Sequence, residues 1–318
     1  MGKKIVFLLL LLVVGCAKIT EEKRAQLALD AYSQGMSAYS RRDYKEAINK
    51  LSEALKYLEN LSPQEIKSAK YTIAESYYLR KDYINAIVYL EDFLFYYPES
   101  PEAEKVYFMV VDSYMKVAPD AYRDQSYTLK AIDKAKEFLT KYPNSPYADR
   151  VISLIDDAQS KLAKHEYLIG RFYEDFGYYY SASLRYKNLL INYPEQISEA
   201  EVLYRYIKSL LLVKKQAKKQ EDKYKGWIEE AQKELKAVKS EEDKKAIQNR
   251  IAFLEREIER WKKLAEDSKQ EGLKLMGKYK EVYGENIYYK KFCKYAFYAL
   301  KGLGWTSKDT FRLVNITP

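Results

Sequence analysis

The sequence predicts an all-α protein built from stacked helical hairpins, with a longer helical hairpin toward its C-terminal end. Apolar residues recur at helical spacing along nearly the whole chain, whereas no segment shows the alternating pattern of a strand. The 318 residues include only 11 Gly and 8 Pro, which disfavours a protein rich in turns or long linkers. A repeated arrangement of aromatic, Ala and Pro residues is the third indication of this fold class.

The N-terminal residues have the features of an export signal. Two lysines precede a run of ten apolar residues that ends at Gly15-Cys16. Such a run is too short to span a bilayer, so we expect residues 1–15 to be a lipoprotein signal peptide. The small residue before Cys16 predicts that this Cys becomes the lipidated first residue of the mature chain, with 16–26 as a tether. The alternative is an ordinary secretory signal with an incidental Cys.

An aromatic residue, an Ala and a Pro recur through the first two thirds of the chain. The pattern resembles the tetratricopeptide repeat, in which two antiparallel helices cross closely at small residues. Pro ends the second helix because it cannot continue one. Residues 27–215 are therefore expected to form about five helix pairs, which stack because no pair covers its apolar stripe alone. Each of four second helices has an Ala at its expected crossing point, and all but the first have a Pro twelve residues later: Ala47, Ala86 with Pro98, Ala131 with Pro143, and Ala182 with Pro194.

The first helices of the pairs are expected to line a concave groove for an extended or helical peptide. The chain contains 33 Tyr, and Tyr combines a large apolar ring with a polar tip that suits such a groove. The alternative is that these side chains fill the space between repeats. Four tyrosines from the first helices of the first two pairs are the candidate peptide contacts: Tyr32, Tyr39, Tyr71 and Tyr78.

A second helical pattern follows the repeats. Between residues 216 and 275, apolar side chains recur at steps of three and four, first at Trp227 and Ala231 and again from Ile247 to Ala265. This spacing is typical of the seam of a coiled coil. Ser240 begins a capping-box sequence, so an antiparallel coiled-coil hairpin is predicted with its turn near this residue. The hairpin either packs on its own repeats or reaches a partner.

The last segment, residues 276–318, is strongly aromatic. The end of a solenoid needs a helix that covers its last exposed apolar face. We therefore expect an aromatic cap followed by a loose tail. The alternative is that this segment is a contact surface for a partner or a membrane.

Composition and motifs argue against several function classes. The formal charge is +9, but Lys and Glu are interspersed as solvated helix faces; a basic patch could still meet anionic lipid or an acidic partner. We do not expect an exported protein to bind nucleic acid. His165 is the one His, and no catalytic triad, Gly-rich phosphate loop or metal-ligand spacing is present. We expect no enzyme and no cofactor other than the lipid on Cys16.

Three strings are more specific than the repeat spacing. Residues 142–148 read YPNSPYA, residues 162–167 read LAKHEY, and residues 170–173 read GRFY. Together with the export signal, they resemble the BamD family of repeat-containing lipoproteins, also called the ComL type. The resemblance covers roughly residues 31–215.

The resemblance implies a non-enzymatic scaffold of the β-barrel assembly machinery, on the periplasmic face of the outer membrane. It implies docking to the periplasmic domains of a BamA-like barrel subunit, reception of C-terminal signals of unfolded outer-membrane proteins, and contact with other assembly lipoproteins. The family's partner-contacting Arg matches Arg185, which is otherwise simply an exposed helix residue. Arg123 and Asp124 match a family loop, where they either fix the loop locally or touch a partner.

One departure and one alternative stay open. Chains of this family usually end soon after the fifth repeat, so the resemblance does not explain the predicted hairpin. Another exported tetratricopeptide adaptor, such as a cell-division or secretin-assembly lipoprotein, is the competing hypothesis.

Overall fold

The computed structural model describes residues 20–300, and every regular element in that range is helical. The predicted signal peptide, the predicted lipidation residue Cys16 and the tail after residue 300 lie outside the described residues. What the sequence predicts for them therefore stays a prediction. The all-α, tetratricopeptide-like fold class is confirmed. The chain forms two compact units; the first extends to residue 158, except for residues 120–123, which belong to the second.

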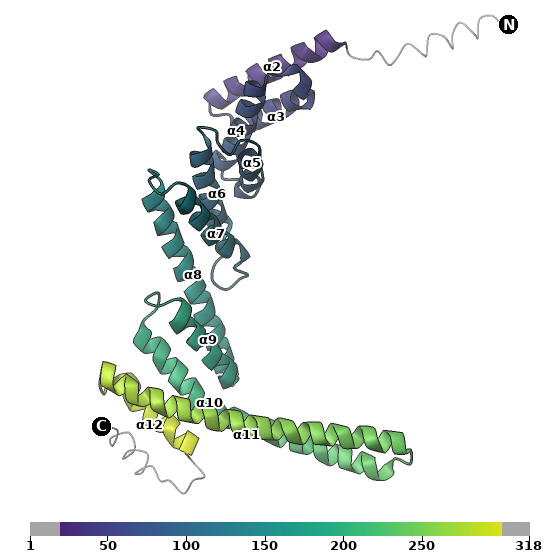
Figure 1. Cartoon of the computed structure of the whole chain (residues 1–318), viewed down its shortest axis with the longest axis vertical. Coiled ribbons are helices and arrows are strands. Elements are labelled where there is room, and N and C mark those ends of the chain that lie inside the picture. Colours follow the sequence, from purple (N-terminus) through teal and green to yellow (C-terminus); the bar gives the residue numbers. More distant parts are fainter. Residues whose placement is uncertain (1–19, 301–318) are drawn as a thin grey trace, which may run out of the picture. The chain divides into compact units, whose positions relative to one another are not determined.

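The first unit contains three helix pairs and the beginning of a longer helix (Figure 1). Each pair consists of a first and a second helix, joined by a tight turn in the first two pairs and by the longer loop 118–125 in the third. A short 3₁₀ helix, η2 (Leu55–Asn60), follows the first pair. The helices are α2 (Glu21–Ser40) with α3 (Tyr44–Ala54), α4 (Pro63–Leu79) with α5 (Tyr83–Tyr96), α6 (Ala103–Val117) with α7 (Ser126–Lys141), and α8 (Ala148–Asp175).

Local chemistry explains where these helices begin and end. The side chain of Asp43 caps α3 by accepting a hydrogen bond from the Glu46 amide at 3.1 Å. Ser62 and Glu65 form a capping box at the start of α4. Pro98 follows closely on the end of α5, where it prevents further helix.

Small residues lie where the paired helices cross. Ala47, Ala74 and Ala86 are fully buried, as predicted. A Cβ atom on Gly35 would lie 2.6 Å from Cγ of Leu51, so this crossing has no room for a side chain. The predicted close crossings are therefore confirmed.

Up to residue 300, where the described residues end, the second unit contains the rest of α8 and four further helices: α9 (Tyr179–Asn192), α10 (Glu199–Ala237), α11 (Glu241–Tyr283) and α12 (Ile287–Leu300). Figure 1 shows α10 and α11 side by side as the two arms of a long antiparallel hairpin. Helix α10 is continuous over 39 residues, so the first helix of the fifth pair and the first hairpin arm are one element. Ser240 caps α11, as its capping sequence predicts.

The hairpin seam is closed within the chain. Ile247, Leu254 and Ile258 of α11 are buried, and so is Ala231 of α10. The expectation that Trp227 lies in this seam is wrong, because its side chain is 44% exposed. Ala231, predicted for the same seam, is buried in it. The indole of Trp227 lies under the Lys223 ammonium, which is 4.5 Å from the ring centre.

Helix α12 packs against both hairpin arms near the repeats. Phe292 is fully buried, with its ring centre 5.4 Å from that of Tyr204 on α10 and 5.2 Å from that of Tyr279 on α11. Tyr289 and Ala296 of α12 are buried in the same cluster. The described part of the aromatic segment thus covers an apolar face of α10 and α11.

Candidate functional site

Two of the four candidate peptide tyrosines join successive first helices of the first unit by hydrogen bonds. The Tyr39 hydroxyl on α2 donates to Oε2 of Glu75 on α4 at 2.5 Å. The Tyr78 hydroxyl on α4 donates to Oδ2 of Asp112 on α6 at 2.9 Å. Both carboxylates are buried. Burial and the neighbouring carboxylate raise the pKa of each tyrosine, so both hydroxyls stay protonated donors.

Glu75 joins three first helices of the unit. Besides Tyr39, it accepts a hydrogen bond from Nζ of Lys105 on α6 at 2.6 Å. The same ammonium lies 5.9 Å from the ring centre of Tyr71. Burial and the Glu75 charge raise the pKa of Tyr71 to about 12. A buried acid therefore organises the candidate tyrosines, although the sequence analysis did not single it out.

The four candidate tyrosines do not form one equivalent set. All are half-buried. Tyr32 packs into the apolar clusters that include Ala31, Leu61 and Ile48, which is an inter-helix filling role. Tyr39 and Tyr78 commit their hydroxyl hydrogens to acids of the next repeat. A peptide bound to this face would therefore contact the tyrosine rings, and the hydroxyl oxygens would act towards it only as hydrogen-bond acceptors.

Arg185 lies on α9 in the second unit and is held by one acid of α8. Its Nη1 atom donates to both carboxylate oxygens of Glu166, at 3.1 and 3.2 Å. The Glu166 side chain is 14% exposed, whereas that of Arg185 is 40% exposed. Arg185 also lines an open recess of about 320 Å³, together with Tyr173 and Leu184. The guanidinium is thus fixed in position and still accessible.

Exposed aromatic side chains continue from this recess. The ring of Phe172 lies 5.8 Å from that of Tyr173, which lines the recess, and 4.6 Å from that of Phe176. Phe172 and Phe176 are both more than half exposed, and so much aromatic surface is unusual outside interaction sites. We name the surface formed by Phe172, Phe176, Tyr173, Leu184 and Arg185 the Arg185 surface. The sequence analysis identified only the Arg.

The loop between α6 and α7 has local structural contacts. An Asp124 carboxylate oxygen accepts the Ser126 amide at 3.0 Å, at the start of α7. The Arg123 amide donates to the carbonyl of Asp120 at 3.2 Å. His165, whose role the sequence left undefined, donates from Nδ1 to the Ala121 carbonyl at 2.8 Å. Both predicted loop residues have exposed side chains.

A buried ionic cluster ties α8, α9 and α10 together. Glu174 accepts the Tyr186 hydroxyl at 2.8 Å and Nη1 of Arg205 at 3.3 Å, and it pairs with Lys208. Burial opposes ionisation, but the Lys208 and Arg205 charges hold the pKa of Glu174 below its ordinary value. The cluster fixes the helices that carry Arg185. This cluster was hard to predict from the sequence, because each of its charged residues is a single interruption of an apolar helix face.

Two negative findings bear on alternative chemistries. Across residues 20–300, no three His, Cys, Asp or Glu side chains come together as a metal-binding group. In the same part of the chain, no helix has both the length and the apolar character to cross a membrane.

Comparisons with known proteins identify the family. The family model YfiO, described as outer membrane lipoprotein, matches residues 24–225. A protein of Aquifex aeolicus (strain VF5), assigned as outer membrane protein assembly factor BamD, is 50% identical over 285 residues, covering 90% of this chain and 93% of the relative. A solved structure, a Rap protein complexed with competence and sporulation factor, aligns over 86% of this chain and 76% of its own at 15% identity, but its TM-score of 0.30 supports no argument. The chain belongs to the YfiO/BamD family of outer membrane lipoproteins.

Proposed function

We propose that this protein is a non-enzymatic, lipid-anchored scaffold of outer-membrane β-barrel assembly. Family membership supports a role in outer-membrane protein assembly, because a relative with 50% identity bears the name of an assembly factor. In the proposal, lipid on Cys16 holds the protein at the periplasmic face of the outer membrane. It docks the periplasmic domains of a BamA-like barrel subunit and receives C-terminal signals of unfolded outer-membrane proteins. Other assembly lipoproteins are further proposed partners.

The Arg185 surface is the proposed docking site for the barrel subunit. The observation that carries this proposal is the half-exposed guanidinium, fixed by Glu166 beside exposed aromatic rings. Arg and aromatic side chains dominate the energetics of protein interfaces. A guanidinium can also pair with a partner carboxylate through two hydrogen bonds. Arg123 and Asp124 remain secondary candidates, because their side chains are exposed on the loop between α6 and α7.

The test is titration of the barrel subunit's periplasmic domains into the full mature chain. Arg185→Glu is expected to weaken binding about a hundredfold, since a buried interfacial charge pair is lost and reversed. The control is Lys164→Glu, which makes the same charge change at an exposed position of α8. The double variant Arg185→Glu/Glu166→Arg restores the intramolecular pair and should still bind weakly. Native affinity of the double variant would mean that Arg185 acts only on the fold.

The half-buried tyrosines of the first unit are the proposed receiving face for the C-terminal signal. Because the Tyr39 and Tyr78 hydroxyls already donate to Glu75 and Asp112, the rings supply most of the contact surface. The double Tyr→Phe variant at these positions should bind a C-terminal peptide of an outer-membrane protein almost as well as the native chain. The double Tyr→Ala variant should lose about tenfold or more.

Fluorescence anisotropy of a labelled peptide measures both affinities. The matched control is Tyr122→Ala, which removes an exposed tyrosine of the second unit. Equal loss in the Phe and Ala double variants would contradict the ring-contact model. Native affinity of the Ala variant would remove these tyrosines from the receiving face.

Affinity purification from solubilised membranes separates this proposal from the competing adaptor hypothesis. An assembly scaffold should co-purify with an outer-membrane barrel subunit that carries periplasmic domains. Recovery of a secretin or a cell-division complex in its place would favour the other adaptor class.

A further inference from the structure

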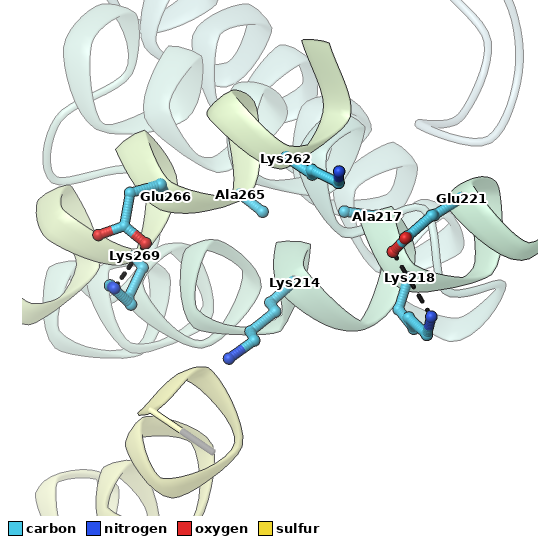
Figure 2. A pocket seen from close by; sticks show the side chains of 8 residues that line it. All are labelled: Lys214, Ala217, Lys218, Glu221, Lys262, Ala265, Glu266 and Lys269. Atoms are coloured by element: carbon cyan, nitrogen blue, oxygen red, sulfur yellow. Dashed lines mark hydrogen bonds and ion pairs between the residues drawn. The ribbon is translucent and has the colours of Figure 1, made fainter. Parts of the chain in front are cut away.

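The base of the α10–α11 hairpin, close to the repeats, satisfies its own charges. Figure 2 shows a pocket of about 240 Å³ between the two arms there. The lysines that line it are bound within the chain; Lys218, for example, pairs with Glu221, and Lys269 pairs with Glu266. The pocket lining is therefore occupied by contacts that the hairpin makes with itself and with α12.

The outer part of the hairpin, between this pocket and the turn, exposes two large aromatic side chains. Trp227 of α10 is 44% exposed, and Phe253 of α11 is 53% exposed. The ring of Trp227 also lies 5.7 Å from that of Tyr224. Figure 1 shows this part of the hairpin extending beyond α9 and α12. Exposed aromatic rings of this kind are enriched in protein interfaces, because they offer a large contact area at little cost in conformational entropy.

The two aromatic side chains lie on the same flank of the hairpin. Glu234 of α10 pairs with Arg250 of α11, so this ion pair marks one flank along which the arms meet. Residues three, four or seven apart lie on one face of a helix. Trp227 is seven residues before Glu234, and Phe253 is three residues after Arg250. We name the flank that contains these four residues the aromatic flank.

The opposite flank carries mainly charged side chains. Several of them pair along their own helix, such as Lys225 with Glu221 and Lys262 with Glu259, which is typical of a solvated helix face. The exposed large apolar side chains of residues 218–262, Trp227 and Phe253, are thus both on one flank. The exposed charged residues of the opposite flank are Asp222, Lys225, Glu229 and Lys236 on α10 and Glu255, Glu259 and Lys262 on α11.

Charge is divided unevenly between the two arms of the aromatic flank. At steps of three, four and seven residues from the rings, α10 contributes one cation and two anions, whereas α11 contributes two cations and one anion. The α10 half of the flank is therefore net negative and the α11 half is net positive, while the whole flank is neutral. These residues are Lys223, Glu230 and Glu234 on α10 and Arg250, Glu257 and Arg260 on α11.

We propose that a second copy of this chain binds to the aromatic flank, with the two hairpins related by a two-fold axis parallel to their length. In this arrangement α10 of each copy lies on α11 of the other, so the acidic half of one flank faces the basic half of the other. Glu234 of one copy lies level with Arg250 of the second copy. Trp227 lies within about 6 Å, along the axis, of Phe253 of the second copy, at about 1.5 Å per residue.

The aromatic flank is large enough for a specific dimer. From residue 218 to the turn, each arm is about 33 Å long, at about 1.5 Å per residue. Two neighbouring helices are together about 20 Å wide. Face-to-face contact would thus bury about 650 Å² on each copy, or about 1,300 Å² in total, which is within the usual range of stable interfaces. A single helix of another protein would cover only about half of this width.

Sedimentation velocity of the full mature chain tests the proposal, with Cys16→Ser so that no lipid is attached. We expect a reversible dimer whose population rises with protein concentration between about 1 and 100 µM. Trp227→Glu/Phe253→Glu should raise the dissociation constant about a hundredfold or more, because charges replace the rings at the centre of the contact.

The matched control is Gln232→Glu/Gln248→Glu, which adds two negative charges on the opposite flank and should dimerise like the native chain. A second variant, Trp227→Ala/Phe253→Ala, adds no charge and should weaken the dimer about tenfold or more. Circular dichroism checks that each variant is folded. Because all four side chains are exposed, none of these changes should unfold the hairpin.

Photo-crosslinking tests how the two hairpins pair. A photoreactive residue replaces Trp227 in an equal mixture of ¹⁴N- and ¹⁵N-labelled chains, so that links between copies carry both labels. The proposal predicts mixed-label links from position 227 to α11, around Phe253. Mixed-label links from this position to α10 alone would contradict the two-fold arrangement.

Two results of the sedimentation experiment would overturn the proposal. A native chain that stays monomeric at about 100 µM would show that the aromatic flank does not bind a second copy. A dimer that Trp227→Glu/Phe253→Glu leaves intact would place the contact elsewhere on the chain. Neither outcome bears on docking at Arg185, so this test and that of the proposed function fail independently.

Discussion

The two units use buried acids in different ways. In the first unit, Glu75 accepts a tyrosine hydroxyl and pairs with Lys105, whose side chain is 47% exposed. In the second unit, Glu174 accepts a tyrosine hydroxyl and pairs with Arg205 and Lys208, both largely buried. When its acid is removed, an exposed cation can be rehydrated, whereas a buried cation stays unpaired. The second unit, which carries the Arg185 surface, should therefore tolerate the loss of its buried acid less well than the first unit.

The largest expected difference comes from removing the charge of each acid. Glu174→Gln leaves two buried cations without their main counter-charge, so we expect the free energy of unfolding to fall by about 3 kcal/mol. Glu75→Gln removes a charge whose partner can be rehydrated, and we expect a loss of about 1 kcal/mol. Urea denaturation followed by circular dichroism measures both, and hydrogen exchange assigns each loss to its unit. Equal losses would break the comparison.

Lowering the pH tests the role of Glu174 in this comparison. Because the pKa of Glu174 is held below its ordinary value of 4.5, its ionised form stabilises the folded state above that pH. This contribution is lost as the pH falls through the folded-state value. The stability difference between the native chain and Glu174→Gln should therefore shrink below pH 4.5. A difference that stays constant from neutral pH to about pH 3 would contradict the assigned ion pairs.

Glycines in helix interiors provide a smaller contrast between the repeats and the hairpin. A Cβ atom at Gly170 would lie 2.7 Å from Cε1 of Tyr186, so Gly170→Ala should destabilise the chain by about 1–3 kcal/mol. A Cβ atom at Gly226 in α10 would meet nothing within 4 Å. Gly226→Ala should stabilise by about 1 kcal/mol, because Ala has the higher helix propensity. Thermal unfolding measures both, and a stabilising Gly170→Ala would show that this crossing is looser than the structure indicates.

The sequence predicted those features that depend on nearby residues. Small residues such as Ala47 and Ala182 mark the close helix crossings, and Pro98 marks the end of a helix, because each acts within one hairpin. Ser240 was predictable for the same reason, since a cap needs only the next turn of its helix. Trp227 was predicted wrongly, because helical spacing does not distinguish a buried stripe residue such as Ala231 from an indole that stays at the helix surface beside Lys223.

The partners of the site residues were not predictable in this way. Tyr39 and Glu75 are 36 residues apart, and Tyr78 and Asp112 are 34 apart, so each pair joins two repeats. Acids are common on helix faces, and one sequence does not show which of them a tyrosine of the preceding repeat will reach. The recess beside Arg185 likewise depends on how two helices pack.

Site-specific photo-crosslinking in whole cells tests the central claim, that the Arg185 surface docks the barrel subunit. A photoreactive residue replaces Leu184, which lines the recess, or Val88, a comparably exposed apolar position on α5. The account predicts that the Leu184 position captures the barrel subunit and that the Val88 position does not. Capture at Val88 with none at Leu184 would contradict it.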